Sequence, residues 1–348
     1  MSQTMLAAVF EGEGNLAVKR VPIPEITKPD QVLLQVEVAG ICGTDVHILE
    51  VPPGHPATPG AILGHEYVGR VVEVGQEVTS LRPGQRVVIA PNLSCGLCPY
   101  CRRGMPNHCQ NFTTLGVYLD GGFAEYNVAP ERACFPISDE LSLEEAVFAE
   151  LLSCVIGGTQ RVRLQPGDSA VILGAGPVGL TFLLLFKAAG AGKIVVSEPA
   201  PFRADFAHKL GVDRVVDPRQ EALAEIVVRE TGWGADVVVD AVGSLLPQAI
   251  PLARRGGMVL LFGMNQQASG TVHQYDITRH ELTIQGTFIG VNTFPTAIQM
   301  LESGALKPSA LITHRFPLER IEKGIEALRA GEAIKVLIRP SAGDEGPK

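Results

Sequence analysis

The feature that most constrains the fold of this chain is a glycine-rich turn between a strand-like run and a helix-like run. The run "SAVIL" begins at residue 169 and leads into "GAGPVG", which opens the apolar stretch "LTFLLLFKAAGA". In such a turn the first glycine permits a tight bend, the second lets the backbone approach a pyrophosphate, and the third lets helix and strand pack closely. The unpaired N–H groups that begin the helix attract the anion. The sequence therefore predicts a dinucleotide site that includes Gly174, Gly176, Pro177, Val178 and Gly179.

This turn belongs to a region in which strands and helices alternate. Strand-like runs recur near residues 169, 193, 214, 235, 257 and 282, separated by helix-length segments. Near-continuous Val/Ile/Leu strands of this kind are typical of a parallel sheet covered on both faces, so we expect a six-stranded, doubly wound Rossmann sheet. Glu198 ends the second strand, 19 positions after Gly179. Its carboxylate can bind both ribose hydroxyls and repel a 2′-phosphate, which favours NAD(H) over NADP(H). The alternative is that Glu198 merely ends a strand beside an ordinary glycine turn.

The residues on either side of this region have a different pattern. From residue 5 to about 90, short β-type runs such as "VLLQVEVAG" and "YVGRVVEVG" are interrupted by Gly and Pro, which indicates a mostly β region. Near the C-terminus, "LERIEKGIEALRAGE" predicts an amphipathic helix and "AIKVLIRP" a closing strand. At 348 residues the chain exceeds one ordinary core, so we expect an α/β protein of two domains. The predicted domains are residues 1–155 with 292–348, mostly β and catalytic, and 156–291, which binds the dinucleotide.

Charge and hydropathy exclude several classes of partner. The formal net charge of −8 argues against a nucleic-acid ligand, because proteins that bind polyanions usually carry a basic face. The longest nearly apolar run, "VGLTFLLLF", is far shorter than the roughly 20 residues that a membrane-spanning helix needs. The first residues do not have the pattern of a secretory signal. We therefore expect a cytoplasmic protein with neither a nucleic-acid nor a membrane partner.

Several residues of the β region are of types that bind zinc. The stretch "GICGTDVH" contains Cys42, "GHEYVG" contains His65 and Glu66, and "FAELL" contains Glu150. A catalytic zinc site uses three thiolate, imidazole or carboxylate ligands and leaves a fourth position open. Taken singly, each residue also has an ordinary interpretation as a small buried hydrophobe, a packed core histidine or a solvated acid.

Together, and in this order, the motifs resemble the zinc-dependent branch of the medium-chain dehydrogenase/reductase superfamily, and within it the polyol (sorbitol-like) and threonine dehydrogenases. The similarity extends nearly end to end and rests on "CGTDVH", "GHE", a quartet of cysteines, "GAGPVG" with its later acid, and "KVLI". It implies a GroES-like fold for the β-rich domain, and a catalytic zinc bound by Cys42 and His65. Either Glu66 or Glu150 would complete the ligand set, and in simple alcohol dehydrogenases a cysteine takes the position of Glu150. Leu151 stands where the family commonly has proline.

The resemblance also assigns roles around the metal. Asp45 would orient His65 by accepting its other ring N–H, and Cys134 and Cys154 would be core cysteines. The substrate proton would pass through Thr44 and His47, although Thr44 could instead cap a helix and His47 could be an ordinary surface histidine.

Four of the seven cysteines lie within the fifteen residues of "CGLCPYCRRGMPNHC". A disulfide framework is disfavoured in the cytosol. A redox-active CxxC pair is a further alternative, but such pairs usually begin a helix in a βαβ context. The spacing C-x₂-C-x₂-C-x₇-C lets one loop surround a single ion with four thiolates, which closes the site to substrate. We therefore predict a lobe at residues 92–112 that is folded by a structural zinc, with the ligands Cys95, Cys98, Cys101 and Cys109.

The implied function is zinc-dependent hydride transfer between a secondary alcohol, in the first place a sugar alcohol or other polyol, and NAD. The enzyme would thus contain two zinc ions per chain, would interconvert a small-molecule alcohol and ketone, and by family precedent would be a homotetramer or, less often, a dimer. The alternatives are an L-threonine 3-dehydrogenase or another secondary-alcohol dehydrogenase, a nucleotide-binding protein that has lost catalysis, and a zinc-finger protein, which the acidic charge disfavours.

The family places further residues in the cofactor and substrate clefts. Arg203 is expected beside the adenosine, and Lys335 near the pyrophosphate. The nicotinamide half of the cleft would be lined by Val242, Gly243, Gly263, Met264 and Thr287. Candidates for the substrate cleft are Phe112, Tyr118, Phe288 and Ile289.

Overall fold

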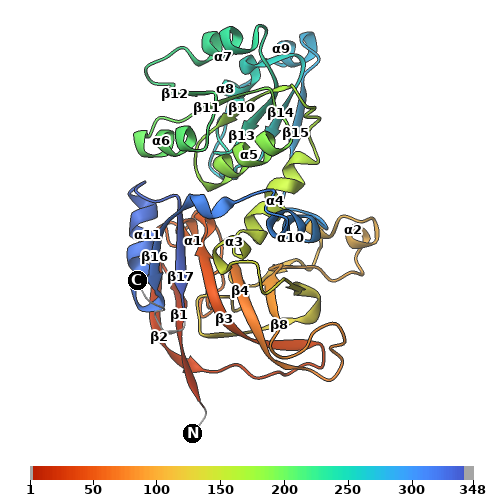
Figure 1. Ribbon diagram of the computed structural model, residues 1–348, viewed down its shortest axis with the longest axis vertical. Helices are drawn as coiled ribbons and strands as arrows, with labels where there is room; N and C mark the ends of the chain where they lie inside the picture. Colours follow the sequence, from red (N-terminus) through yellow and green to blue (C-terminus); the bar gives the residue numbers. More distant parts are fainter. Residues whose placement is uncertain (1–2, 341–348) are drawn as a thin grey trace. The chain divides into compact units, whose positions relative to one another are not determined.

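The computed structural model describes residues 3–340, and these residues divide into two compact units (Figure 1). One unit contains the described residues up to Leu151 together with those from Val291 onward. The other unit is Leu152–Gly290. The first boundary falls inside helix α4 (Ala149–Thr159), so one continuous helix belongs partly to each unit. Because the chain leaves the first unit and later returns to it, that unit is discontinuous in sequence.

A mostly antiparallel sheet of seven strands forms the centre of the first unit. Its strands run in the order β16-β17-β3-β4-β5-β9, and β8 also pairs with β3. Every second residue of β3 from Val32 to Val38 is buried, because successive side chains of a strand point to opposite faces. The strands are β3 (Gln31–Ile41), β4 (Glu66–Val74), β5 (Arg86–Ile89), β8 (Tyr126–Pro130), β9 (Cys134–Pro136), β16 (Ile312–Pro317) and β17 (Lys335–Arg339).

Two small sheets and several short helices complete the first unit. The small sheets are β1 (Thr4–Gly12) with β2 (Asn15–Pro22), and β6 (Asn92–Leu93) with β7 (Thr113–Thr114). The helices are α1 (Gly43–Ile48), α2 (Pro99–Arg102), α3 (Leu143–Ala146), α10 (Phe294–Glu302) and α11 (Ile321–Arg329). Ser142 caps α3 by accepting a hydrogen bond from the Glu145 N–H at 3.2 Å. The helical pattern that starts there forms two helices, α3 and α4, rather than one.

The second unit is the predicted parallel sheet of six strands. The order β12-β11-β10-β13-β14-β15 reverses between β10 and β13, and all five pairings are parallel. The strands are β10 (Ser169–Leu173), β11 (Lys193–Ser197), β12 (Arg214–Val216), β13 (Ala235–Asp240), β14 (Ala253–Leu261) and β15 (Thr283–Gly286). This is the Rossmann topology, so the fold prediction for this region is confirmed.

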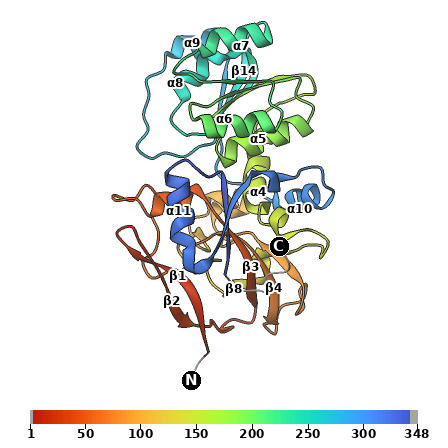
Figure 2. The ribbon, with the colours of Figure 1, turned by 60° about the vertical axis from the view of Figure 1, so that its left-hand side comes forward.

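Helices cover both faces of the parallel sheet. Figure 2 shows α5 (Pro177–Ala188) and α6 (Pro201–Lys209) on one face, and α7 (Leu223–Thr231), α8 (Leu246–Ala249) and α9 (Gln274–Arg279) on the other. The strand residues between these layers, such as Val171, Val195 and Val238, are completely buried. A ligand of such a sheet binds at the carboxyl ends of the strands, beside the reversal of strand order. Among the described residues, no helix is long and apolar enough to cross a membrane.

Candidate metal and cofactor site

The predicted catalytic metal ligands lie together in the first unit, at the end of strand β3 and the start of the neighbouring strand β4. Strand β3 ends at Ile41, so Cys42 follows it directly as the N-cap of α1. Strand β4 begins at Glu66, which pairs with Gly40 of β3 in the antiparallel register. This register brings Cys42 beside His65 and Glu66, although more than twenty residues separate them in the chain. One ligand atom from each of the three residues lies within 4.8 Å of the other two.

The surroundings of His65 fit a metal on this side chain. Asp45 is 1 % exposed; its Oδ2 accepts from the Cys42 N–H at 2.8 Å, and its Oδ1 lies 3.7 Å from His65 Nδ1. Neither this oxygen nor His65 Nδ1 has a hydrogen-bond partner among the described residues. Burial favours the neutral imidazole, but the negative charges of Cys42 and Asp45 outweigh it and raise the pKa of His65 well above its ordinary value. With Nδ1 facing Asp45, Nε2 is the nitrogen available to a metal.

The two candidate glutamates differ in position. Glu66 is 1 % exposed and belongs to the group of converging ligand atoms, whereas Glu150, at 9 % exposed, does not. A thiolate, an imidazole and a carboxylate form a suitable ligand set for zinc. The residues present therefore fit a catalytic zinc, with Glu66 as the carboxylate that lies within reach of Cys42 and His65.

Lys335 lies in this cluster, although its expected partner was the cofactor pyrophosphate. Its side chain is 1 % exposed and its Nζ forms an ion pair with Glu66 Oε2. Burial opposes the charged form, but the Glu66 carboxylate outweighs this effect and raises the pKa of Lys335. The structure thus gives Lys335 a partner that the sequence did not predict.

Thr44 and His47 both lie on α1. The N-cap of this helix is Cys42, so Thr44 is not the cap; its Oγ1 lies 3.8 Å from Cys42 Sγ. The side chain of His47 is 53 % exposed, and its Nδ1 is 2.9 Å from Glu50 Oε1. A hydroxyl next to the candidate metal and a histidine open to solvent are suited to proton transfer. Glu50 was not predicted; it lies beyond the end of α1, and its position three residues after His47 was the available signal.

The four clustered cysteines converge in the first unit. The Cys98 sulfur lies 3.5 Å from that of Cys101 and 3.9 Å from that of Cys109, which is 3.5 Å from the Cys95 sulfur. A tetrahedron with metal–sulfur bonds of about 2.3 Å requires sulfur–sulfur distances of about 3.8 Å. The backbone N–H of Asn111 also donates to the Cys109 sulfur at 3.3 Å. The quartet therefore fits a closed zinc site.

The environments of the four thiols differ. Hydrogen bonds from the backbone N–H groups of Leu97 and Cys98 lower the pKa of Cys95 to about 6. Desolvation raises the pKa of Cys101 to about 11. Outside the quartet, Cys134 is 6 % exposed and packs in the core, where burial raises its pKa to about 12; Cys154 is partly buried.

The glycine-rich turn has the shape that a bound phosphate requires. Gly174 has φ +97°, and a Cβ on Gly179 would lie 1.9 Å from the Gly174 carbonyl oxygen, so both positions require glycine. Gly176 is the N-cap of α5 and Pro177 follows it. A Cβ on Gly176 would have no described atom within 4 Å, so space is open above the start of the helix. This opening and the free N–H groups of a twelve-residue helix fit a dinucleotide phosphate.

Glu198 connects the glycine turn to the next strand. It is 4 % exposed; its Oε2 accepts from the Ala175 N–H and its Oε1 from the Ala200 N–H, each at 2.8 Å. Each carboxylate oxygen keeps a second lone pair for a ribose hydroxyl. Close by in sequence, Arg203 has a buried Nε without a hydrogen-bond partner among the described residues.

The residues expected around the nicotinamide follow the ends of three parallel strands. Val242 and Gly243 follow β13, Gly263 and Met264 follow β14, and Thr287 follows β15. A Cβ on Gly243 would lie 2.5 Å from the carbonyl carbon of Gly263, so the two backbones touch.

The sequence did not single out Asp240, which shapes this turn. Its Oδ1 accepts from the Val242 and Gly243 N–H groups at 2.9 and 2.8 Å. The available signal was one buried acid at the end of a valine run.

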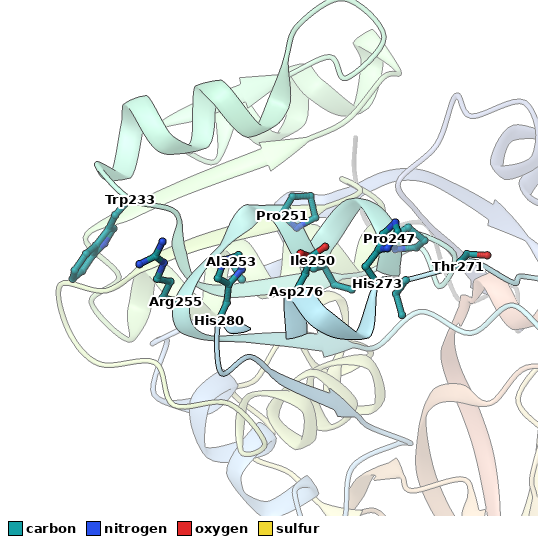
Figure 3. A pocket seen from close by; sticks show the side chains of 11 residues that line it. Trp233, Pro247, Ile250, Pro251, Ala253, Arg255, Thr271, His273, Asp276 and His280 are labelled. Atoms are coloured by element: carbon teal, nitrogen blue, oxygen red, sulfur yellow. The ribbon is translucent and has the colours of Figure 1, made fainter. Parts of the chain in front are cut away.

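The second unit also has a cavity of about 540 Å³, which none of the predicted site residues lines. Figure 3 shows this cavity, with Trp233 and Arg255 near one end and His273 and Asp276 on its wall. Of the proposed substrate-cleft residues, Phe112 and Tyr118 belong to the first unit, and Phe288 and Ile289 to the second. Neither unit alone contains all four side chains, so the predicted substrate cleft is not described by the structure of one unit.

Comparison with known proteins agrees with this geometry. Residues 28–139 match the alcohol dehydrogenase GroES-like domain, and residues 177–303 match the zinc-binding dehydrogenase family. D-arabinitol dehydrogenase 1 of Uromyces fabae is 33 % identical, and the alignment covers 97 % of each chain. L-threonine 3-dehydrogenase of Caldanaerobacter subterraneus is 36 % identical over 97 % of this chain and 99 % of its own. A zinc-binding dehydrogenase of Sinorhizobium meliloti 1021, solved with NADP, is 34 % identical, with a TM-score of 0.93 over 97 % of this chain and 100 % of its own.

Proposed function

The chain belongs to the zinc-dependent medium-chain dehydrogenase family, in its polyol branch, and from this premise we propose that it oxidises a polyol with NAD. The observation that carries the proposal is the convergence of Cys42, His65 and Glu66 to within 4.8 Å of one another, with Thr44 beside them. A ligand set of three different donors with a neighbouring hydroxyl suits an open catalytic zinc. The cysteine quartet would hold a second, structural zinc.

When bound, zinc supplies Lewis-acid stabilisation of the alkoxide, and NAD accepts the hydride. Cys42, His65 and Glu66 would hold the metal, and Asp45 would keep the His65 ring in one orientation. The hydroxyl of Thr44 would accept the proton of the substrate alcohol while donating its own proton onward, and the solvent-exposed His47 would exchange that relayed proton with water. Gly174, Gly176 and Gly179 would let the cofactor phosphates approach the start of α5.

The substrate class follows from the relatives and from the family. The similarity to a D-arabinitol dehydrogenase supports a pentitol or hexitol. The similarity to an L-threonine 3-dehydrogenase makes threonine the second candidate. Glu198 disfavours a 2′-phosphate by charge, which supports NAD rather than NADP.

Three further features belong to the same proposal. Residues 156–291 would bind the cofactor, and residues 1–155 with 292–348 would carry the metals. The acidic chain would work in the cytoplasm, and it would assemble as a homotetramer, as the family precedent suggests.

The test is an assay of NAD reduction with D-arabinitol, sorbitol, xylitol and galactitol, compared with L-threonine and simple secondary alcohols. We expect turnover of at least one polyol, which chelation abolishes and added zinc restores, while NADH binding persists without the metal. Activity on threonine alone would reverse the order of the two substrates. A zinc-loaded protein that binds NADH but oxidises none of these alcohols would refute the proposed enzyme.

A further inference from the structure

Lys335 and Glu66 meet across a strand at a residue that has no side chain. Strand β3 lies between β17 and β4, and its Gly40 pairs with Leu337 on one side and with Glu66 on the other. A Cβ on Gly40 would lie 2.6 Å from Glu66 Oε2 and 2.8 Å from Lys335 Cε. A side chain at residue 40 would therefore contact the ends of both charged side chains. Glycine at this position leaves the space over β3 in which the ammonium and the carboxylate meet.

Both members of this ion pair are almost completely buried. Lys335 and Glu66 are each 1 % exposed. Lys335 Nζ also lies 3.4 Å from the Ile41 carbonyl oxygen and 5.7 Å from the centre of the Phe148 ring. A buried charge is strongly destabilising when it has no partner, so each member of the pair requires the other. Lys335 is therefore a built-in counter-ion of an acid in the candidate metal site.

We propose that Lys335 is a positioning residue that holds Oε2 of Glu66, leaves Oε1 for zinc, and keeps the site folded when zinc is absent. This inference rests on the proposed function only in taking Glu66 as a zinc ligand. In a protein without zinc, the ammonium supplies the positive charge that the buried carboxylate needs. With zinc bound, the Lys335 ammonium compensates part of the negative charge that Cys42, Glu66 and Asp45 place around the zinc.

This role differs from contact with the cofactor pyrophosphate. An anion outside the unit would have to reach an ammonium that is 1 % exposed and already paired with Glu66. A pyrophosphate contact predicts a defect in cofactor binding, whereas the counter-ion role predicts a defect in the protein without zinc. The two roles can therefore be separated by experiment.

The experiment compares Lys335→Met, which removes the charge but keeps the length, with Lys335→Arg and with the full-length parent chain. Each protein is purified with zinc, and thermal unfolding is measured before and after chelation. The control is Lys19→Met, which breaks an exposed pair with Glu11 in the same unit; such pairs contribute little. The cysteine quartet is the same in all variants, so its zinc affects them equally.

We expect chelated Lys335→Met to unfold at a temperature roughly 6–20 °C below the chelated parent. With zinc bound the difference should be smaller, because the metal supplies charge to Glu66. Chelator competition should then show a zinc dissociation constant roughly tenfold or more lower in Lys335→Met than in the parent. Lys335→Arg should lie near the parent in both forms.

A second background keeps the test informative if chelated Lys335→Met does not fold. In Glu66→Gln a neutral amide replaces the carboxylate and Lys335 loses its charged partner, so adding Lys335→Met should cost little or even stabilise the chelated protein. Equal melting shifts with and without zinc, together with a raised dissociation constant for NADH in equilibrium binding, would overturn the proposal in favour of pyrophosphate contact. These readouts require no turnover, so an absence of polyol oxidation would refute the proposed function without deciding the role of Lys335.

Discussion

Loss of the zinc held by the cysteine quartet should unfold one lobe and leave the rest of the first unit intact. Between Ser94 and Phe112, a fully described stretch, the buried residues are Cys98, Asn107 and Cys109. The apolar core of the unit includes Leu93, near the start of the lobe, and Leu115, beyond its end, but no residue between them. The lobe therefore contributes to its own folding mainly through the metal. The perturbation that tests this is Cys98→Ser, which removes a ligand that is 8 % exposed.

The expected magnitude follows from comparing two contributions. Complete burial of one large apolar side chain is worth roughly 1.5–3 kcal/mol, and between Ser94 and Phe112 no such side chain is buried. A structural zinc in a small domain is worth roughly 10–16 kcal/mol at neutral pH. Removal of one thiolate should forfeit much of that, and a local loss of only about 3 kcal/mol already raises the open population roughly a hundredfold.

The assay is limited proteolysis with trypsin, combined with hydrogen exchange. Arg102 and Arg103 are exposed in the lobe, and the Arg102 and Gly104 N–H groups donate to carbonyls of the lobe at 3.0 Å. In Cys98→Ser we expect cleavage at these arginines to accelerate by at least roughly a hundredfold. The exchange protection of these amides should disappear, while strands β3 and β4 remain protected.

A suitable control is Cys134→Ala, which removes a thiol from the core of the same unit. It should lower the unfolding temperature of the unit without exposing the lobe to trypsin. The reasoning fails if the chelated protein and Cys98→Ser keep the lobe amides as protected as in the zinc-loaded parent. That result would mean that the polypeptide alone folds this stretch.

Four further outcomes are expected. Thr44→Ala should lower kcat roughly 10²–10⁴-fold with unchanged zinc content, measured by single-turnover kinetics and metal analysis. His47→Asn should lower kcat without changing the zinc content, measured in the same way, since the exchanging imidazole is lost. Glu198→Ala should raise KM for NAD more than for NADP, because it removes both a hydroxyl acceptor and a repelling charge. In chelated protein at pH 7, iodoacetamide should label Cys95 and Cys101 at similar rates by mass spectrometry, because unfolding of the lobe removes the hydrogen bonds that lower the pKa of Cys95 to about 6 and the burial that raises that of Cys101 to about 11.

The parts of the fold that could be predicted from the sequence are those with a local sequence pattern. The six parallel strands were visible because each is a short apolar run, and the glycine turn because Gly174 and Gly179 have no room for a side chain. The cysteine quartet was equally clear, because its ligands lie within one loop. By contrast, strand β16 was not predicted, because "ITHRFP" has no apolar run. Every residue of this strand is partly or fully exposed, so neither of its faces is buried.

Relations between distant residues could not be predicted in the same way. Lys335 and Glu66 are 269 positions apart, and their contact depends on the register of two strands with β3. The choice between Glu66 and Glu150 likewise required the positions of both side chains around Cys42, which no spacing in the sequence supplies. Asp240 was overlooked because its hydrogen bonds reach only the next turn, which has no distinctive pattern before folding.

The discontinuity of the first unit has a consequence for biosynthesis. Ribosomes deliver a chain from its N-terminus, and domains generally fold as they emerge. Strand β3 cannot pair with β17 until the whole parallel-sheet unit has been translated, because β17 begins only at Lys335. During that interval the nascent polypeptide already carries Cys42, His65 and Glu66 but lacks the ammonium that faces this acid in the finished fold. Completion of the metal pocket is therefore a late event that follows release of the last strand from the ribosome.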